Sequence, residues 1–383
     1  MDVKFAPVMA NANNFPVAII RATPAFCVTD FRRLGQSTDF SQCIYTRNGR
    51  AAIALAAQQL MHSNKANVVL LPAYHCPALV EPFLWLGYEI RFYPVLPDLT
   101  VDEDIFLQYL TADVTHCLVV RFFGFQQNNK QLINLAALAG KVIIEDYAHA
   151  LADFLQQLEQ VNSAVAARIC SINKILPTID GGLLYMQQPI NIKPQYCSWY
   201  EEAKAIAFLF KIPQFIQYFK SKLNKSSSQK ISTIDQTTSN EQTSVQPVNP
   251  FKYFQPEDLS AASFRHTKLI LQSSDFAKIK AQRCANYNYL ANALSASRAG
   301  HCLYPQADSE SPYVLPFLLN KAADFQRLRM QKIQVLRWEE VAYSQCKVSD
   351  DYRSRLVQLP CHHKLKKAEL DYIINAVQNL VNQ

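Results

Sequence analysis

The sequence predicts an α/β protein built on a mostly parallel sheet that helices cover on both faces. Apolar runs typical of strands alternate with helical patterns between residues 50 and 172, as in sheets of this class. One run, 142–144, is apolar throughout, which indicates a strand buried on both faces. With 383 residues, 49% of them hydrophobic, the chain is long enough for a large core.

The expected elements follow in a regular order. Asn48-Gly49 is typical of a turn that opens a helix, and 50–61 is rich in Ala and Leu. Beyond it, the patterns predict helices over 77–86, 102–110 and 131–138 and strands over 66–71, 88–95, 116–122 and from 141. The run 167–172 predicts the next strand, and 154–159 fits a short helix before it.

A polar segment divides the chain. Ser, Thr, Gln and Asn dominate residues 221–250, which cannot bury enough apolar surface to offset the entropy of ordering. We therefore expect a large domain over 1–220, a flexible linker over 221–250 and a smaller α/β domain over 251–383. In the smaller domain the patterns predict helices over 262–271, 275–294 and 367–380 and a strand over 313–319.

The aromatic stretch 196–223 allows two interpretations. Lys204, Lys211 and Pro213 interrupt its apolar part, which is too short to span a bilayer. A helix on a membrane surface fits the lysines that follow at 220, 222 and 225. A helix covered at a domain or dimer interface fits the apolar surface and is the commoner case.

Charge and cysteine content exclude several classes of protein. The formal net charge is +7, but Lys and Arg form no dense block, so nucleic-acid binding is not indicated. The ten cysteines include no C-x-x-C pair, and Cys361-His362-His363 lacks further ligands nearby in the sequence. Neither a metal site nor a disulfide framework is expected. The N-terminus lacks the pattern of a secretory signal, which predicts a reducing, cytoplasmic location.

Polar residues stand at the carboxyl ends of two predicted strands, where open α/β sheets bind ligands. Asp146 and His149 follow one strand, and Ser171 and Lys174 stand at the end of the next. Pyridoxal phosphate requires a lysine for its Schiff base and an acid that keeps its pyridine nitrogen protonated. An ion pair between Asp146 and Lys174 that only stabilises the sheet edge would give the same spacing. The residue types alone leave both interpretations open.

Five motifs follow one another in a fixed order. They are Asn48-Gly49-Arg50-Ala51-Ala52, Leu71-Pro72-Ala73-Tyr74-His75-Cys76, Asp146-x-x-His149, Ser171-x-x-Lys174 and Gly181-Gly182. In this order they resemble the DegT/StrS family of aminotransferases, over most of the chain. The resemblance implies a fold-type-I pyridoxal phosphate enzyme, with a three-layer large domain and a smaller C-terminal α/β domain. It also implies a homodimer with the cofactor near the subunit boundary.

The resemblance assigns roles to three of these residues. Lys174 would bind the cofactor as a Schiff base and then move a proton during the reaction. Asp146 would hold the pyridinium proton, and His149 would donate a hydrogen bond to the phenolic oxygen of the cofactor. Family members that dehydrate sugars carry His at the lysine position, so Lys174 favours transamination.

The same resemblance assigns the cofactor phosphate to the start of the first helix. A helix N-terminus offers free N–H groups and the positive end of a dipole. Gly49 would supply backbone contacts, and Ser171 would add a hydroxyl. The family usually has Ser-Gly-Thr where this chain has Asn48-Gly49-Arg50, so the charge of Arg50 is a departure that could add a contact to the phosphate.

The residue that stacks on the cofactor ring is less well matched. The best-matching position is Cys76, whose side chain cannot stack as an aromatic ring does. Tyr74 or His75 could take its place, and core packing explains all three residues equally well.

The predicted function is therefore a pyridoxal-phosphate-dependent aminotransferase acting on small molecules. It would move an amino group from an amino acid, expected to be glutamate, to a keto sugar nucleotide or a related small carbonyl compound. Two alternatives remain open. Another reaction of the same cofactor, such as decarboxylation or elimination, would depend on residues outside the motifs. A regulatory protein that binds the cofactor without turnover would fit the poor match at Cys76.

Overall fold

The main element of the structure, a computed structural model, is a seven-stranded sheet. The structure describes residues 3–10, 14–27, 30, 39–158, 164–210, 251–308 and 310–382. The strand order is β1-β7-β6-β5-β4-β2-β3. β7 runs antiparallel to its neighbours β1 and β6, and all other neighbouring strands are parallel. The predicted mostly parallel sheet is confirmed.

The central strands are apolar because they are buried along their whole length. β2, β4 and most of β5 and β6 are buried on both faces of the sheet. Their sequences therefore do not alternate between apolar and polar residues. β1 lies at the sheet edge, is only partly buried and was not predicted. The strands are β1 (Cys43–Thr46), β2 (Val68–Pro72), β3 (Glu89–Tyr93), β4 (His116–Val120), β5 (Val142–Asp146), β6 (Val165–Ser171) and β7 (Gly182–Met186).

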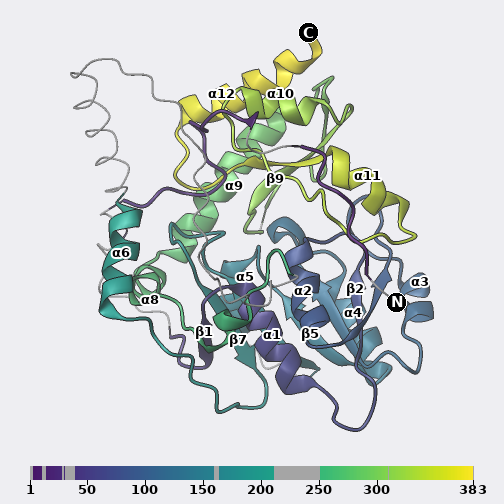
Figure 1. The fold of residues 1–383 in the computed structure, drawn as a ribbon. Helices are drawn as coiled ribbons and strands as arrows, with labels where there is room; N and C mark the ends of the chain where they lie inside the picture. The colour runs from purple at the N-terminus through teal and green to yellow at the C-terminus, as the bar shows by residue number, and fades with distance from the viewer. Residues whose placement is uncertain are drawn as a thin grey trace, which may run out of the picture.

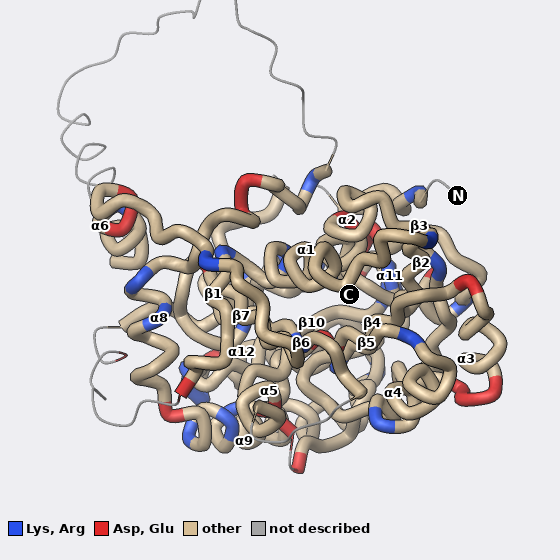
Figure 2. The backbone as a smooth tube through the Cα atoms, turned by 90° about the horizontal axis from the view of Figure 1, so that it is seen from below, with Lys and Arg blue, Asp and Glu red and all other residues tan. Residues whose placement is uncertain are grey.

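Helices cover both faces of this sheet. α1 (Gly49–Leu60) and α2 (Pro77–Trp85) lie on one face, and α4 (Asn129–Leu138) and α5 (Leu151–Leu158) lie on the other, with α3 (Glu103–Tyr109) beside α4 (Figures 1 and 2). Residues 51–57 of α1 are all buried, five of them alanines. Small side chains allow this helix to approach β6 and β7 closely. The N-terminus of α1 is thereby fixed at the carboxyl end of the sheet.

A second, antiparallel sheet has the order β10-β9-β8 and lies at the other end of the molecule with the C-terminal helices (Figure 1). α9 packs on β8, β9 and α12. The N-terminal segment joins this region, because Phe5 bridges to Ala342 and Ile20 to Ile333. The elements are α6 (Trp199–Leu209), α8 (Arg265–Gln272), α9 (Phe276–Leu294), β8 (Gly300–Cys302), β9 (Val314–Leu319), α10 (Asp324–Met330), α11 (Lys347–Arg355), β10 (Leu356–Pro360) and α12 (Lys367–Gln378).

Most predicted helices and strands agree with these bounds to within a few residues. α10 and α11 were not predicted, because each is short and buries only two or three side chains. So few buried positions do not produce a periodic pattern. The predicted linker 221–250 and the end of the aromatic stretch 196–223 lie outside the described residues.

Other expectations concern what the described part of the chain contains. No helix there is long and apolar enough to cross a membrane. No group of three or more His, Cys, Asp and Glu side chains there is arranged to hold a metal ion. Cys361 and His362 are buried directly after β10 and pack against the core. Lys, Arg, Asp and Glu residues are scattered over the fold (Figure 2).

Candidate active site

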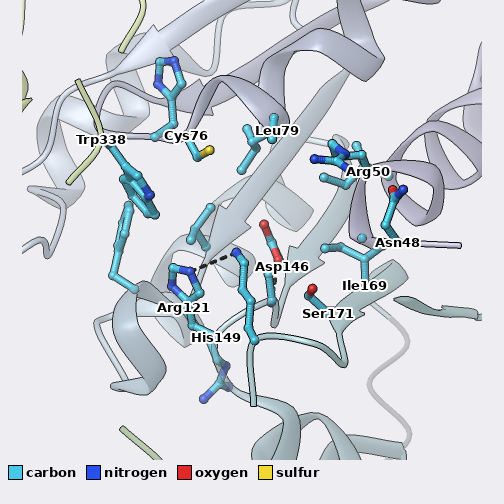
Figure 3. A pocket seen from close by; sticks show the side chains of 18 of the residues that line it. Asn48, Arg50, Cys76, Leu79, Arg121, Asp146, His149, Ile169, Ser171 and Trp338 are labelled. Atoms are coloured by element: carbon cyan, nitrogen blue, oxygen red, sulfur yellow. Dashed lines mark hydrogen bonds between the residues drawn. The ribbon is translucent and has the colours of Figure 1, made fainter. Parts of the chain in front are cut away.

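A cavity of about 390 Å³ lies at the carboxyl ends of β2, β4, β5 and β6, where α1 begins (Figure 3). The structure brings together in its lining all eight residues predicted for the site: Gly49, Arg50, His75, Cys76, Asp146, His149, Ser171 and Lys174. Parallel strands explain this convergence, because their carboxyl ends meet at one edge of the sheet.

Lys174 and His149 are in direct contact. The Nζ atom of Lys174 lies 3.0 Å from Nε2 of His149, the dashed line in Figure 3. Nδ1 of His149 accepts a hydrogen bond of 3.1 Å from the N–H group of Phe123. The proton of the neutral ring is therefore on Nε2, where it faces the lysine.

This arrangement requires an uncharged lysine, because Nε2–H can donate only to an amine with a free lone pair. Burial lowers the pKa of Lys174 and lowers that of His149 well below its usual value. The hydrogen bond and burial thus favour the uncharged amine, whereas the nearby Asp146 carboxylate favours the charged form. An uncharged amine is the form of lysine that attacks an aldehyde.

Aromatic side chains fix the ring of His149. Tyr313 stacks on it with ring centroids 4.6 Å apart, Phe123 at 5.7 Å and Trp338 at 5.6 Å. Phe123 lies in the 3-10 turn η3 (Phe122–Gly124) and has a φ of 57°, a value that bulky residues rarely adopt. Such backbone strain often occurs at functional sites. Phe123, Tyr313 and Trp338 were not predicted for the site, since none belongs to a recognisable motif.

Asp146 is the last residue of β5 and is 5% exposed. Its Oδ1 atom accepts a hydrogen bond of 2.7 Å from the N–H group of Ala148. Burial raises the pKa of this carboxyl to about 6, while the charge of Lys174 and the Ala148 hydrogen bond act in the other direction. A buried carboxylate of this kind is suited to a cationic ring N–H as a partner.

The N-terminus of α1 has free hydrogen-bond donors at the cavity. Both polar atoms of the N-cap Asn48 side chain are hydrogen-bonded, since Oδ1 accepts from Ala51 N–H at 3.0 Å and Nδ2 donates to Asp258 at 2.6 Å. The N–H groups of Gly49 and Arg50 have no acceptor within the helix. A Cβ on Gly49 would lie 3.5 Å from the Cβ of Ser171, so the helix end and the end of β6 are in contact.

Arg50 points to an anionic ligand at the same place. Its side chain lines the cavity near Asn48 (Figure 3), and its buried Nε atom has no hydrogen-bond partner among the described residues. Arg121 also lines the cavity, but its Nε donates to Glu145 at 3.3 Å. An unpaired guanidinium donor beside a helix N-terminus is complementary to a phosphate group.

The ring nitrogens of His75 are both used within the protein. Nδ1 donates to the carbonyl of Pro72 at 3.0 Å, Nε2 accepts from the N–H group of Ala342 at 3.1 Å, and the ring stacks on Phe92. Neither nitrogen is available to a ligand. His75 lies at the cavity but makes contacts typical of a structural histidine.

Cys76 and Tyr74 also line the cavity, as the second motif suggested. Burial raises the pKa of the Cys76 thiol. The hydroxyl of Tyr74 is buried without a hydrogen-bond partner among the described residues, and its ring lies 5.0 Å from that of Trp338. Trp338 reaches the cavity from the C-terminal half and lies on the other side of Asp146 from Arg50 (Figure 3).

The Gly-Gly motif has a steric basis. A Cβ on Gly182 would lie 2.4 Å from the carbonyl oxygen of Asn48, and Gly181 has a φ of 115°. Only glycine at both positions lets β7 start against the first turn of α1.

One protein family matches part of the chain, including most of the residues that line this cavity. Residues 31–197 match the model of the DegT/DnrJ/EryC1/StrS aminotransferase family. The resemblance predicted from the motifs is confirmed, and with it the class of a pyridoxal-phosphate-dependent aminotransferase. No curated protein matches the chain as a sequence.

Solved structures share the fold over nearly the whole chain. PseC of Helicobacter pylori, an aminotransferase involved in the biosynthesis of pseudoaminic acid, has a TM-score of 0.61 at 13% identity, covering 95% of this chain and 98% of its own. TlmJ, an aminotransferase of Streptoalloteichus hindustanus, has a TM-score of 0.63 at 15% identity, covering 92% and 89%. The PLP-form of Spr1654, a putative sugar aminotransferase of Streptococcus pneumoniae, has a TM-score of 0.61 at 15% identity, covering 96% and 99%. The predicted fold type I is confirmed.

Proposed function

We propose that this aminotransferase binds pyridoxal phosphate covalently through Lys174 and transfers an amino group from an amino acid to a keto sugar nucleotide or a related small carbonyl compound. Glutamate is the expected donor. One observation supports the proposal best: the partly buried Lys174 amine contacts His149 in a cavity that Asp146 also lines. The acceptor class rests on the similar structures, which include sugar aminotransferases.

The residues around the cavity are suited to three parts of the cofactor: the pyridine nitrogen, the phenolic oxygen and the phosphate. Asp146 would hold the pyridine N–H, and Nε2–H of His149 would donate to the phenolic oxygen. The N–H groups of Gly49 and Arg50, the Arg50 side chain and the Ser171 hydroxyl would bind the phosphate. When bound, the cofactor supplies an electron sink for charge that develops at the substrate α-carbon.

Lys174 would act twice at this site. Its amine would hold the cofactor covalently. The same amine, three residues beyond β6, would move a proton away from the substrate α-carbon. The ring of His149 would stay directed at the phenolic oxygen because it is fixed by Phe123 N–H and the stacked aromatic side chains.

Absorbance spectroscopy tests this function directly. Purified protein loaded with pyridoxal phosphate should absorb between about 320 and 430 nm, and L-glutamate should bleach the longer-wavelength band. Adding 2-oxoglutarate should restore it. A bound cofactor that no amino acid bleaches would contradict transamination and favour a binding protein without turnover.

Replacing Arg50 by methionine should weaken cofactor binding without unfolding the protein. The substitution removes a charge-assisted contact to the phosphate, which corresponds to about a 10–100-fold rise in the Kd of pyridoxal phosphate. Equilibrium dialysis measures the Kd, and circular dichroism checks the fold. Arg91→Met, which removes a surface arginine paired with Glu89 and Asp113, is the matched control. Equal affinities in Arg50→Met and wild type would remove Arg50 from the phosphate site.

We also propose that the active unit is a cytoplasmic homodimer. On α6, Trp199, Tyr200 and Phe208 are 74%, 78% and 59% exposed, which is more aromatic surface than a monomer normally shows. All ten cysteines are free thiols, which suits a reducing compartment. Light scattering should give about twice the chain mass of 43.5 kDa. Phe208→Asp should weaken the dimer, and a fully active monomer would contradict the proposal.

A further inference from the structure

A buried carboxylate outside the predicted site holds one wall of the cavity. Glu81 lies in α2 and is 4% exposed. Its Oε2 atom accepts hydrogen bonds of 2.7 Å from the N–H groups of both Tyr253 and Phe254, and Oε1 accepts one of 3.2 Å from Lys252. Three successive N–H groups around one anion form a backbone nest. The segment that carries Tyr253 is therefore bound to the helix beside the cavity.

The nest sets the direction of the Tyr253 side chain. Phe254, the next residue, is completely buried and its ring lies 5.4 Å from that of Trp85. Tyr253 instead lines the cavity, and its hydroxyl donates a hydrogen bond to Glu340. With the backbone held by Glu81 and the neighbour buried, the ring of Tyr253 has little freedom to leave the wall.

Glu340 connects this wall to a second part of the lining. It accepts hydrogen bonds of 2.9 and 2.8 Å from Nζ of Lys252, in addition to that from Tyr253. Two positions before it, Trp338 lines the cavity, and two positions after it, Ala342 N–H donates to His75. Residues 252–254 and residues 338–342, which are far apart in the sequence, are thus joined by hydrogen bonds at the cavity.

Tyr253 and Trp338 have no role in the cofactor contacts proposed above, yet both line the same cavity. Aromatic rings give flat apolar surfaces with a polar edge, which suit a small substrate that carries both apolar C–H groups and polar groups. Building on the proposed function, we propose that Tyr253 contacts the substrate and that Glu81 is the positioning residue that holds Tyr253 in place.

A double-mutant cycle tests this link with L-glutamate as the probe. In Glu81→Gln the concentration of L-glutamate that half-saturates bleaching should rise about 10-fold or more, because a charged acceptor of three N–H groups is lost. The maximum bleaching rate should change by less than about threefold, since Lys174 and Asp146 are untouched. Tyr253→Ala should raise the half-saturating concentration at least as much. The double variant should be no worse than Tyr253→Ala, because Glu81 acts through that side chain.

Hydrogen exchange gives a readout that does not require activity. The amides of residues 252–254 should exchange about 10-fold faster in Glu81→Gln and return toward the wild-type rate in Glu81→Asp. Tyr253→Ala should leave their exchange slow, because the nest is intact. Glu257→Gln removes an exposed carboxylate from the same segment and should match wild type in every measurement.

Three outcomes would overturn the proposal. Additive effects in the double variant, or a fall in maximum rate at an unchanged half-saturating concentration, would show that Glu81 does not act through Tyr253. Unchanged exchange in Glu81→Gln would show that it does not hold the segment. If no amino acid bleaches the wild-type protein, the proposed function fails, and exchange still decides the role of Glu81.

Discussion

Replacing Lys174 by alanine should reduce transamination by at least about a thousandfold, since the variant loses both the group that binds the cofactor and the base that moves the proton. Pyridoxal phosphate should still bind, because the contacts proposed for Asp146, Gly49 and Arg50 do not involve this amine. Borohydride reduction followed by peptide mapping should label Lys174 in the wild-type protein and nothing in Lys174→Ala.

Lys174→Arg is the matched control for charge. Arginine places a permanent cation beside Asp146 but cannot form the covalent link, so it should be as inactive as alanine. This result would separate the chemistry of the amine from its electrostatic effect on Asp146. A borohydride label on any other lysine, or substantial turnover in either variant, would show that the reactive lysine lies elsewhere.

The sequence predicts those site residues whose position follows from a short stretch of neighbouring residues. Asp146 and Lys174 stand at the ends of apolar runs, and a buried strand followed by a polar residue is visible in a short window. The parallel order of these strands then brings the residues to one edge of the sheet. The antiparallel direction of β7 has no such local signal, because it depends on pairing with β1 and β6.

The rest of the cavity comes from contacts between distant segments. Trp338 precedes α11 in a stretch without regular structure, and Tyr313 immediately precedes β9. Whether such a residue reaches His149 depends on the packing of the second sheet. The spacing of apolar residues in the sequence predicts strands and helices but does not predict how they pack together. Glu81 looks like an ordinary charged residue in a helix, and only the fold shows that it faces three backbone N–H groups. His75 is the opposite case, because a motif indicated it but its ring is used structurally.

Replacing Asp146 by asparagine should reduce turnover on the order of a thousandfold while making the cofactor-free protein more stable at pH 7. The loss of activity follows from the loss of the charge that keeps the pyridine nitrogen protonated, an effect of several kcal/mol for a buried pair. The gain in stability follows from burial. A rise in the Asp146 pKa from 3.8 to about 6 makes the ionised carboxylate about 3 kcal/mol less favourable in the folded protein than in the unfolded chain.

The pH dependence fixes the sign of this effect. Between about pH 4 and pH 6 the folded cofactor-free protein retains the Asp146 proton that the unfolded chain releases, so its free energy of unfolding falls as the pH rises. Above about pH 6 the free energy of unfolding has fallen by its full amount, and below about pH 4 it has not yet begun to fall. Asparagine does not titrate, so the difference between variant and wild type should grow from near zero at about pH 4 to its full size at pH 7.

Urea unfolding of both cofactor-free proteins across this range measures the difference. Asp113→Asn is the contrasting control: the Asp113 carboxylate is on the surface, and its hydrogen bond to Arg91 lowers its pKa, so any effect on stability should have the opposite sign. Adding pyridoxal phosphate should cancel the advantage of Asp146→Asn, because the pyridinium offsets the buried charge in the wild type alone. A variant less stable than wild type at pH 7 without cofactor would mean that Asp146 already has a stabilising partner in the protein, as the sheet-edge ion pair with Lys174 requires. A variant with near-normal turnover would assign the pyridine nitrogen to another carboxylate.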